Sequence, residues 1–200
     1  MALSKIQAES MNLADTYAFT GTVSGAGEAN DYVHLSTTNS TNVASVDLSY
    51  GSGYGSHIVI VKNLYTQNDS DFRMRWKTSS GVVTSSNYHH SAHMHNSAGS
   101  ADTYQGSNAD YHYIFGAVDN NGNGEDIRSS CFIHIPKVTT GNNPSYSGHG
   151  YVQHHNGGRF TLQFAGIHSS LTSEVTGLSF FAGSGNLADI SISIYGVKDA

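Results

Sequence analysis

The sequence predicts an all-β protein: an antiparallel two-sheet jelly-roll sandwich with an extended N-terminal arm. Three observations predict it. Short segments with apolar residues at every second position recur from about Asp31 onward, which is the pattern of half-buried strands. Turn residues such as those at 120–124 and 155–158 separate these segments. No segment after residue 30 shows an apolar 3.6-residue period long enough for a helix.

The most regular of these segments lies near the C-terminal end, at residues 177–197. Ile190, Ile192 and Ile194 alternate there with polar residues. Between residues 184 and 186, Ser-Gly-Asn supplies the positive-φ positions that a tight connection needs. We therefore predict a C-terminal hairpin, strand–turn–strand, that pairs into a sheet.

Residues 71–77 alternate apolar and cationic side chains, so the apolar ones should point inward. The outward row consists of Arg73, Arg75 and Lys77, and it is either a solvated strand face or a contact for an acidic partner. The same alternation in later strands completes a predicted core of Phe72, Met74, Trp76, Phe160, Leu162, Phe164, Phe180, Ile190, Ile192 and Ile194.

Further strands are predicted at residues 43–50, 57–65, 111–118, 126–138, 150–155, 158–167 and 174–182. Residues 57–65 carry apolar side chains on both faces, which is typical of a central strand. About nine or ten strands in a chain of this length fit a sandwich, and an up-and-down barrel is the alternative.

Residues 1–30 contain little core material, so we expect an arm or linker there and the sandwich domain at residues 31–200. Ser4 and Gln7 have the spacing of a capping box, which allows a short helix at residues 5–12. Leu13, Tyr17 and Phe19 have no local apolar partner, so we predict that this assembly arm docks onto a neighbouring subunit. A frayed terminus is the alternative.

Residues 78–110 are rich in Ser, Asn, Gly and His and interrupt the strand pattern. Some thirty residues without regular structure are unusual in a compact domain. The sequence therefore predicts either a short hairpin around residues 82–97 or an exposed binding loop. In the second case Tyr88, His89, His90 and Tyr104 form a recognition loop, because tyrosine gives a large contact area at low entropy cost.

Four of the 12 histidines lie within residues 89–95. In a strand His93 and His95 share one face, so both imidazoles can reach one metal ion. Two ligands are too few for a closed site, but a threefold axis would bring six nitrogens together. We therefore predict that the protein has no cofactor and that histidine serves as a polar aromatic residue in this segment. The alternative is a divalent transition metal at a trimer axis, held by His93 and His95.

Composition limits the possible partners and compartment. A formal net charge of −6 and a charged share of only 12% argue against nucleic acid, whose phosphates require clustered Lys and Arg. No run approaches the roughly 20 apolar residues of a membrane span, so no membrane insertion is expected. Cys131 is the one cysteine and is predicted to be a small buried hydrophobe. With no visible signal peptide, synthesis in a reducing cytoplasm is expected.

Catalytic signatures are missing from the sequence. It has no nucleophile elbow, no phosphate loop and no His-Glu-x-x-His segment. Residues 119–126 superficially resemble a calcium loop, but they lack its ligand series, so an acidic turn is predicted. No convincing pair of carboxylates for glycoside cleavage is visible either. We therefore predict a protein that is not an enzyme.

The two ends of the chain resemble known proteins. Residues 177–197, with the pair Phe180-Phe181, alternating Ile and Ser, and the ending Tyr195-Gly-Val, resemble the last two strands of jelly-roll virion proteins of tailed bacteriophages. Residues 3–25 are similar to the openings of small structural proteins of marine phages. Together these segments cover about a fifth of the chain. The resemblance implies a virion context, and some phage tail fibres use a His-x-His pair to hold metal on a threefold axis.

We therefore expect a non-enzymatic virion structural protein, a tail-fibre or capsid-surface component, located in the virion and made in the host cytoplasm. It would act through oligomeric assembly, with a trimer favoured, and through surface recognition. Its expected partners are other virion proteins and a host surface glycan. The alternative is a carbohydrate-binding or receptor-binding module that uses Tyr/His-rich loops, and a β-sandwich depolymerase is a third possibility.

Overall fold

The structure is a computed structural model that describes residues 31–96, 99, 101–118, 128–137, 141–153 and 158–198. Several predictions fall on residues outside these ranges. They concern the assembly arm with Leu13, Tyr17 and Phe19, the helix at residues 5–12 and the acidic turn at residues 119–126. These remain predictions.

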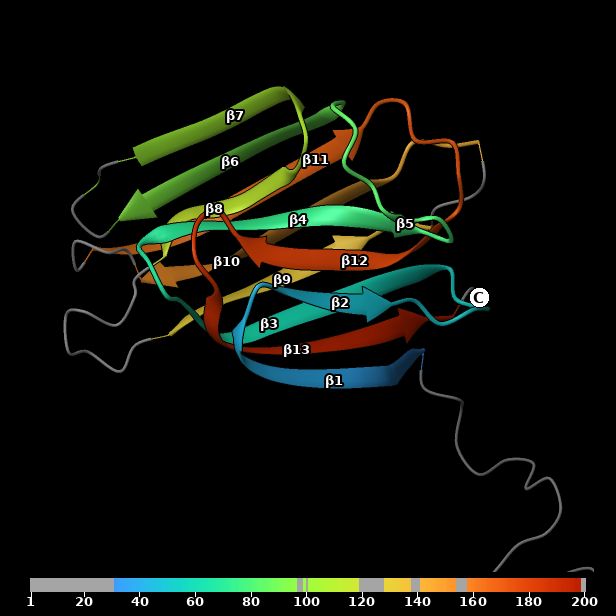
Figure 1. Ribbon diagram of the computed structural model, residues 1–200, viewed down its shortest axis with the longest axis horizontal. Helices are drawn as coiled ribbons and strands as arrows, with labels where there is room; N and C mark the ends of the chain where they lie inside the picture. The colour runs from blue at the N-terminus through green and yellow to red at the C-terminus, as the bar shows by residue number, and fades with distance from the viewer. Residues whose placement is uncertain are drawn as a thin grey trace, which may run out of the picture. The chain divides into compact units, whose positions relative to one another are not determined.

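The described residues from Asp31 onward form two antiparallel sheets that pack as a jelly-roll-like sandwich, as predicted (Figure 1). The large sheet has eight strands in the order β1-β13-β3-β9-β10-β11-β6-β7. The small sheet has five, in the order β2-β12-β4-β5, with β8 paired to β4. The strands are β1 (Tyr32–Val43), β2 (Ser45–Ser49), β3 (Ser56–Thr66), β4 (Ser70–Thr78), β5 (Gly81–Val82), β6 (Tyr88–Asn96), β7 (Ala101–Ala109), β8 (His112–Val118), β9 (Ser129–Ile135), β10 (Ser145–Gln153), β11 (Arg159–His168), β12 (Val175–Ala182) and β13 (Leu187–Val197).

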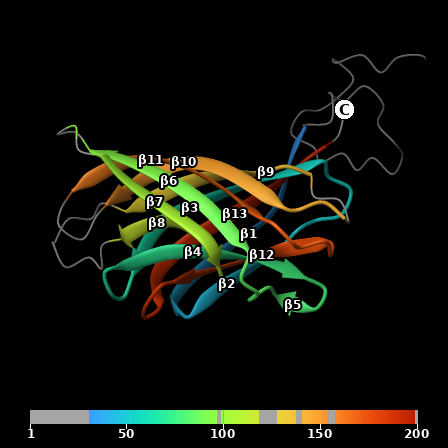
Figure 2. The same cartoon turned by 90° about the horizontal axis from the view of Figure 1, so that it is seen from above.

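Strands from the beginning and the end of the domain pair with each other in both sheets. In the large sheet β1 lies beside β13, with Ser40 opposite Ile190. In the small sheet β2 lies beside β12, with Leu48 opposite Leu178. The view from above shows the two sheets as separate layers (Figure 2). This nesting of early and late strands gives the sandwich its jelly-roll-like order.

The core lies between the two sheets, and all ten predicted core residues are buried. Phe72 of β4 stacks on Phe180 of β12, with ring centroids 5.3 Å apart and planes within 4° of parallel. Trp76 has no exposed surface, and Cys131 is also buried, as predicted. The alternation of apolar side chains therefore identified the inner faces of β4, β11, β12 and β13 correctly.

The predicted C-terminal hairpin is wrong, because its two strands belong to different sheets. β12 pairs with β2 and β4, whereas β13 pairs with β1 and β3. The connection at residues 183–186 carries the chain across the sandwich, with Gly185 at a φ of +68°. Alternation determines which face of a strand is buried but not which strand lies beside it. The two apolar faces therefore belong to opposite sheets and share one core.

Residues 78–110 do not form an exposed loop, so that alternative is wrong. They contain β5 and a long antiparallel hairpin, β6–β7, in which His93 lies opposite Thr103. The hairpin alternative was correct in kind, but the hairpin lies later in the chain than predicted. The reason is that Tyr88 and His90 occupy inner-face positions usually held by aliphatic residues. The inner face of β6 therefore did not stand out as apolar.

The outward cations of β4 pair with carboxylates of the same chain. The pairs are Arg73 with Asp71 at 2.8 Å, Lys77 with Asp47 at 2.7 Å, and Arg75 with Asp110. The Arg73 and Arg75 guanidinium groups also lie over the rings of Tyr111 and Phe181, at 4.1 and 4.6 Å. The row is therefore engaged within the small sheet rather than simply solvated.

Candidate functional site

The outer face of the large sheet carries many of the histidine side chains in the described part of the chain. On β9, β10, β11 and β6 the core residues alternate with outward residues, because successive side chains of a strand point to opposite faces. We call the outward set the histidine face: Phe132, His134, Ser147, His149, Thr161, Gln163, Ala165, His89, Ser91, His93 and His95.

Strand register arranges the histidine face into parallel rows. One row runs across four strands as Phe132, His149, Gln163 and His93. Neighbouring strands lie about 4.8 Å apart, so this row spans roughly 14 Å. The next row consists of His134, Ser147, Ala165 and Ser91. Large side chains therefore fill the first row, and small ones occupy the middle of the second.

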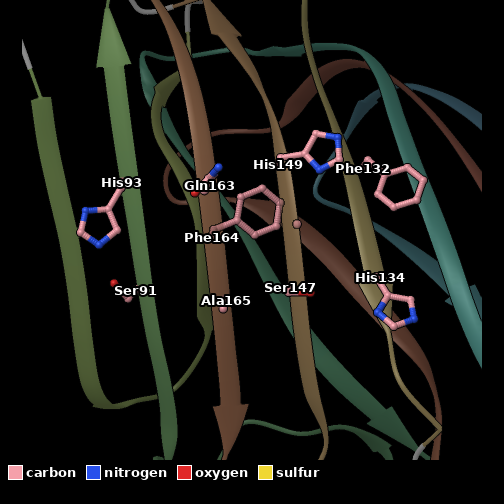
Figure 3. A pocket seen from close by; sticks show the side chains of 10 residues that line it. Ser91, His93, Phe132, His134, Ser147, His149, Gln163, Phe164 and Ala165 are labelled. Atoms are coloured by element: carbon pink, nitrogen blue, oxygen red, sulfur yellow. The ribbon is translucent and has the colours of Figure 1, made fainter. Parts of the chain in front are cut away.

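The small side chains of the second row leave a shallow hollow of about 560 Å³ (Figure 3). Figure 3 shows the imidazoles of His93, His134 and His149 around it, with the ring of Phe132 beside His149. The Phe132 and His149 rings are stacked, with centroids 5.4 Å apart and an angle of 23° between their planes. Imidazole and aromatic rings thus surround the hollow, and serine and alanine side chains line its middle.

Two further hollows continue this surface. One of about 640 Å³ extends toward β7 and shares Ser91 and Ala165 with the first. Another, of about 390 Å³, shares His93, His149 and Gln163 with the first and includes His95. Shared walls make the three hollows one elongated surface, which suits an extended ligand better than a compact one.

The charge of this surface is unusual for a chain with a net charge of −6. Strands β6, β9, β10 and β11 contain no Asp and no Glu, and their one Lys or Arg is Arg159. The outer face of the small sheet, by contrast, carries the Asp–cation pairs of β4. The histidine face therefore offers hydroxyl, amide and imidazole groups in place of carboxylates.

Neighbouring side chains hold two of the imidazoles in place. His93 Nδ1 lies 3.2 Å from the Thr103 hydroxyl on β7, which leaves Nε2 pointing elsewhere. His89 contacts the Ser169 hydroxyl through Nε2 at 3.1 Å and the Ser107 hydroxyl through Nδ1 at 3.4 Å. Such contacts select one orientation of each ring, so a ligand meets groups that are already positioned.

His93 and His95 are both exposed on the outer face of β6, on either side of the buried Met94. The nearest histidine in the same hollow, His149, stands on β10, with β11 between. Within the described ranges, no three His, Cys, Asp or Glu side chains of one chain come together as a metal cluster. His93 and His95 of one chain are too few to close a metal site, so a metal at a trimer axis stays a prediction.

We expect protein purified without an affinity tag to contain one divalent transition metal per three chains if His93 and His95 meet their mates on a threefold axis. Acidification should release the metal, because protonated imidazole cannot ligate. Elemental analysis with a chelator-induced thermal shift measures this. Less than one metal per three chains, with no effect of chelator on the thermal midpoint, would show that His93 and His95 do not hold a metal.

The structure does not bring the four predicted recognition residues together. Tyr88 is buried: its hydroxyl donates to the Val83 carbonyl at 2.8 Å and accepts from the Trp76 N–H at 3.1 Å. Burial raises the pKa of Tyr88 to about 12. A recognition role for Tyr88 is therefore wrong, because it cannot reach a ligand without unfolding β6.

The other three predicted recognition residues lie on different sides of the hairpin. His90 and Tyr104 belong to the inner side, where the Tyr104 ring stacks on Tyr113 at 4.7 Å. Burial lowers the pKa of His90. His89 lies on the histidine face, and both His89 and His90 line the hollow that extends toward β7.

Sequence reasoning missed His134, His149, Phe132 and Gln163 as members of one site. His134 and His149 lie far from residues 89–95 in the chain, and nothing in the sequence says that β9 and β10 pair. The available signal was their outward position in alternating strands. Combining these positions into a row requires the strand order.

A search of protein-family models, of curated proteins and of solved structures found no match to this chain. In the part of the chain that the structure describes, no helix is long and apolar enough to cross a membrane.

Proposed function

We propose that the protein is a non-enzymatic bacteriophage virion protein, a tail-fibre or capsid-surface component, that acts by oligomeric assembly and surface recognition. The observation that carries the proposal is the histidine face: a carboxylate-free, elongated surface on one side of a rigid sheet. The resemblance of the two chain ends to phage virion proteins supplies the context.

A host surface glycan is the partner that the chemistry of this face favours. Gln163 and the serines both donate and accept hydrogen bonds, as neutral imidazoles do, and these properties match sugar hydroxyls. The stacked Phe132–His149 pair adds an aromatic surface beside Gln163. The same features support the alternative of a dedicated carbohydrate-binding module, whose contacts would come from strands rather than from loops.

The positions and ion-pair partners of the carboxylates support a non-enzymatic role. Hydrolysis of a glycoside uses two carboxyl groups that flank the bond. On the histidine face the strands supply none. Four aspartates elsewhere are engaged with cations: Asp47, Asp71, Asp110 and Asp189.

The edges of the large sheet support assembly. β1 and β7 form its two edges, and neither strand contains a Lys or a Pro, the residues that commonly block edge pairing. We propose a homo-oligomer, with a trimer favoured, that contacts other virion proteins through residues 1–30 and is made in the host cytoplasm.

Deletion of residues 1–25 should leave the sandwich folded, because β1 begins only at Tyr32, but should prevent incorporation into particles. Circular dichroism reports the fold, and immunogold electron microscopy of particles reports incorporation. Full-length protein should label virions at one structure, tail or capsid surface. Absence of label from particles would contradict the proposed function, and unfolding of the truncated protein would contradict the docking arm alone.

A further inference from the structure

A separate pocket of about 380 Å³ lies where strands of both sheets end. The segment between β2 and β3 lines it together with the residues after β9 and the start of β12. It shares no lining residue with the histidine face. We propose that this pocket binds a single neutral sugar ring, and this inference does not depend on the proposed function.

Three aromatic rings form one wall of the pocket. The Tyr50 ring stacks on the His57 ring, with centroids 4.4 Å apart and an angle of 15° between the planes. The Tyr54 ring meets His57 edge-on at 6.0 Å. Gly196 makes room for Tyr54, because a Cβ there would lie only 2.4 Å from its ring. The wall is therefore held in position by the surrounding backbone and offers an aromatic surface to a ligand.

Two polar atoms of this wall are buried without a hydrogen-bond partner: Tyr50 Oη and His57 Nε2. Leaving such groups unpaired is costly, and native structures rarely do so without a functional reason or a partner that completes them. Both residues line the same pocket. Less than 1 Å² of each atom is exposed, so a ligand in that pocket can supply the missing hydrogen bonds only when the Tyr50 and His57 rings shift toward it.

The protonation states of the two groups define what the ligand must offer. Burial raises the pKa of Tyr50 well above its ordinary value, so the phenol keeps its proton. Burial lowers the pKa of His57, although a hydrogen bond with the Gly51 backbone acts in the opposite direction. Nε2 has no partner, and the neutral ring presents it as a donor or an acceptor according to which nitrogen carries the proton. The pair thus needs a ligand that both donates and accepts.

A sugar ring meets these requirements together. Its hydroxyls donate and accept, and its C–H face can pack on the aromatic wall. The lining carries one cation, Lys137, and one anion, Glu174, so it has no net charge to favour an ionic ligand. The volume is at the lower end of the roughly 300–1,000 Å³ that ligand pockets occupy, which favours one ring over a chain.

The test uses full-length protein and four probes: glucose, galactose, mannose and N-acetylglucosamine. We expect saturation-transfer NMR to detect at least one of them. Tyr50→Phe should weaken that sugar roughly tenfold, the cost of one hydrogen bond to the ligand. The matched control, Tyr111→Phe, changes a half-buried tyrosine outside the pocket and should bind as wild type does.

A second readout separates binding from folding. Tyr50→Phe removes a hydroxyl that has no partner in the ligand-free protein, so its thermal midpoint should stay the same or rise. In wild-type protein the sugar should shift the amide resonances of residues 51–54, whether or not it also shifts those of the histidine face. No binding of any of the four sugars, unaltered affinity in Tyr50→Phe, or shifts confined to the histidine face would overturn the inference.

Discussion

Trp76→Ala should lower the free energy of unfolding by about 3–5 kcal/mol, a large part of the 5–15 kcal/mol typical of a domain. Trp76 is fully buried in β4, and its indole N–H donates to His112 Nε2 at 3.0 Å. Its ring also meets Tyr146 edge-on at 6.3 Å. The substitution therefore leaves a cavity and removes a buried hydrogen bond together. Urea denaturation followed by fluorescence of the remaining tyrosines, or by circular dichroism, measures the loss.

The matched control for this substitution is Val82→Ala, in the short strand β5 that pairs with β4. Val82 is 38% exposed, so its truncation should change stability by no more than about 0.5 kcal/mol. A loss below about 1 kcal/mol for Trp76→Ala would mean that the indole is not packed between the sheets.

Acid should destabilise the protein well before its carboxylates are protonated. His112 lies in the core against Trp76 of β4, Tyr88 and His90 of β6 and Tyr146 of β10. Burial, and then the nearby His90, His168 and His89, hold the pKa of His112 well below 6.5. Burial is also the main cause that lowers the pKa of the other three inward histidines, His57, His90 and His168.

The sign of the effect follows from proton uptake. Above about pH 6.5 these imidazoles are neutral in both the folded and the unfolded chain, so their full contribution to stability is present. As the pH falls below that value, the unfolded chain binds protons that the folded chain excludes. The free energy of unfolding should then fall by up to about 1.4 kcal/mol per pH unit for each such histidine, until its folded pKa is reached.

Urea denaturation at pH 8, 6.5 and 5 measures this dependence. His112→Gln keeps a hydrogen-bond acceptor for Trp76 but does not titrate, so its stability should change less between pH 6.5 and 5 than that of wild type. Equal stability at pH 8 and pH 5 would contradict the burial of these imidazoles.

Local periodicity was enough to predict the face of each strand but not its neighbours. The alternation through Phe72, Met74 and Trp76 correctly placed these residues in the core, because the side-chain period of a strand is a local property. The pairing of β12 and β13 depends on contacts with β2 and β1, more than 120 residues earlier. Turn chemistry at residues 184–186 could not distinguish a hairpin from a crossing between sheets.

The candidate site was harder to predict than the core. The sequence singled out His93 and His95 because they are close together in the chain, and both lie on the histidine face. Their neighbours on that face, Gln163 and His149, come from β11 and β10, and only the register joins them. Tyr88 was predicted to contact a ligand because it is an aromatic residue in a polar segment. It packs in the core instead.

Recognition through the histidine face can be tested directly by measuring binding to an array of bacterial surface polysaccharides. The protein should bind at least one polysaccharide, and the double variant His93→Ser/His149→Ser should weaken that binding at least tenfold while unfolding as wild type does. His34→Ser, which removes an exposed histidine from β1 at the far edge of the same sheet, should have no effect. No binding by wild-type protein, or equal binding by the double variant, would contradict the account.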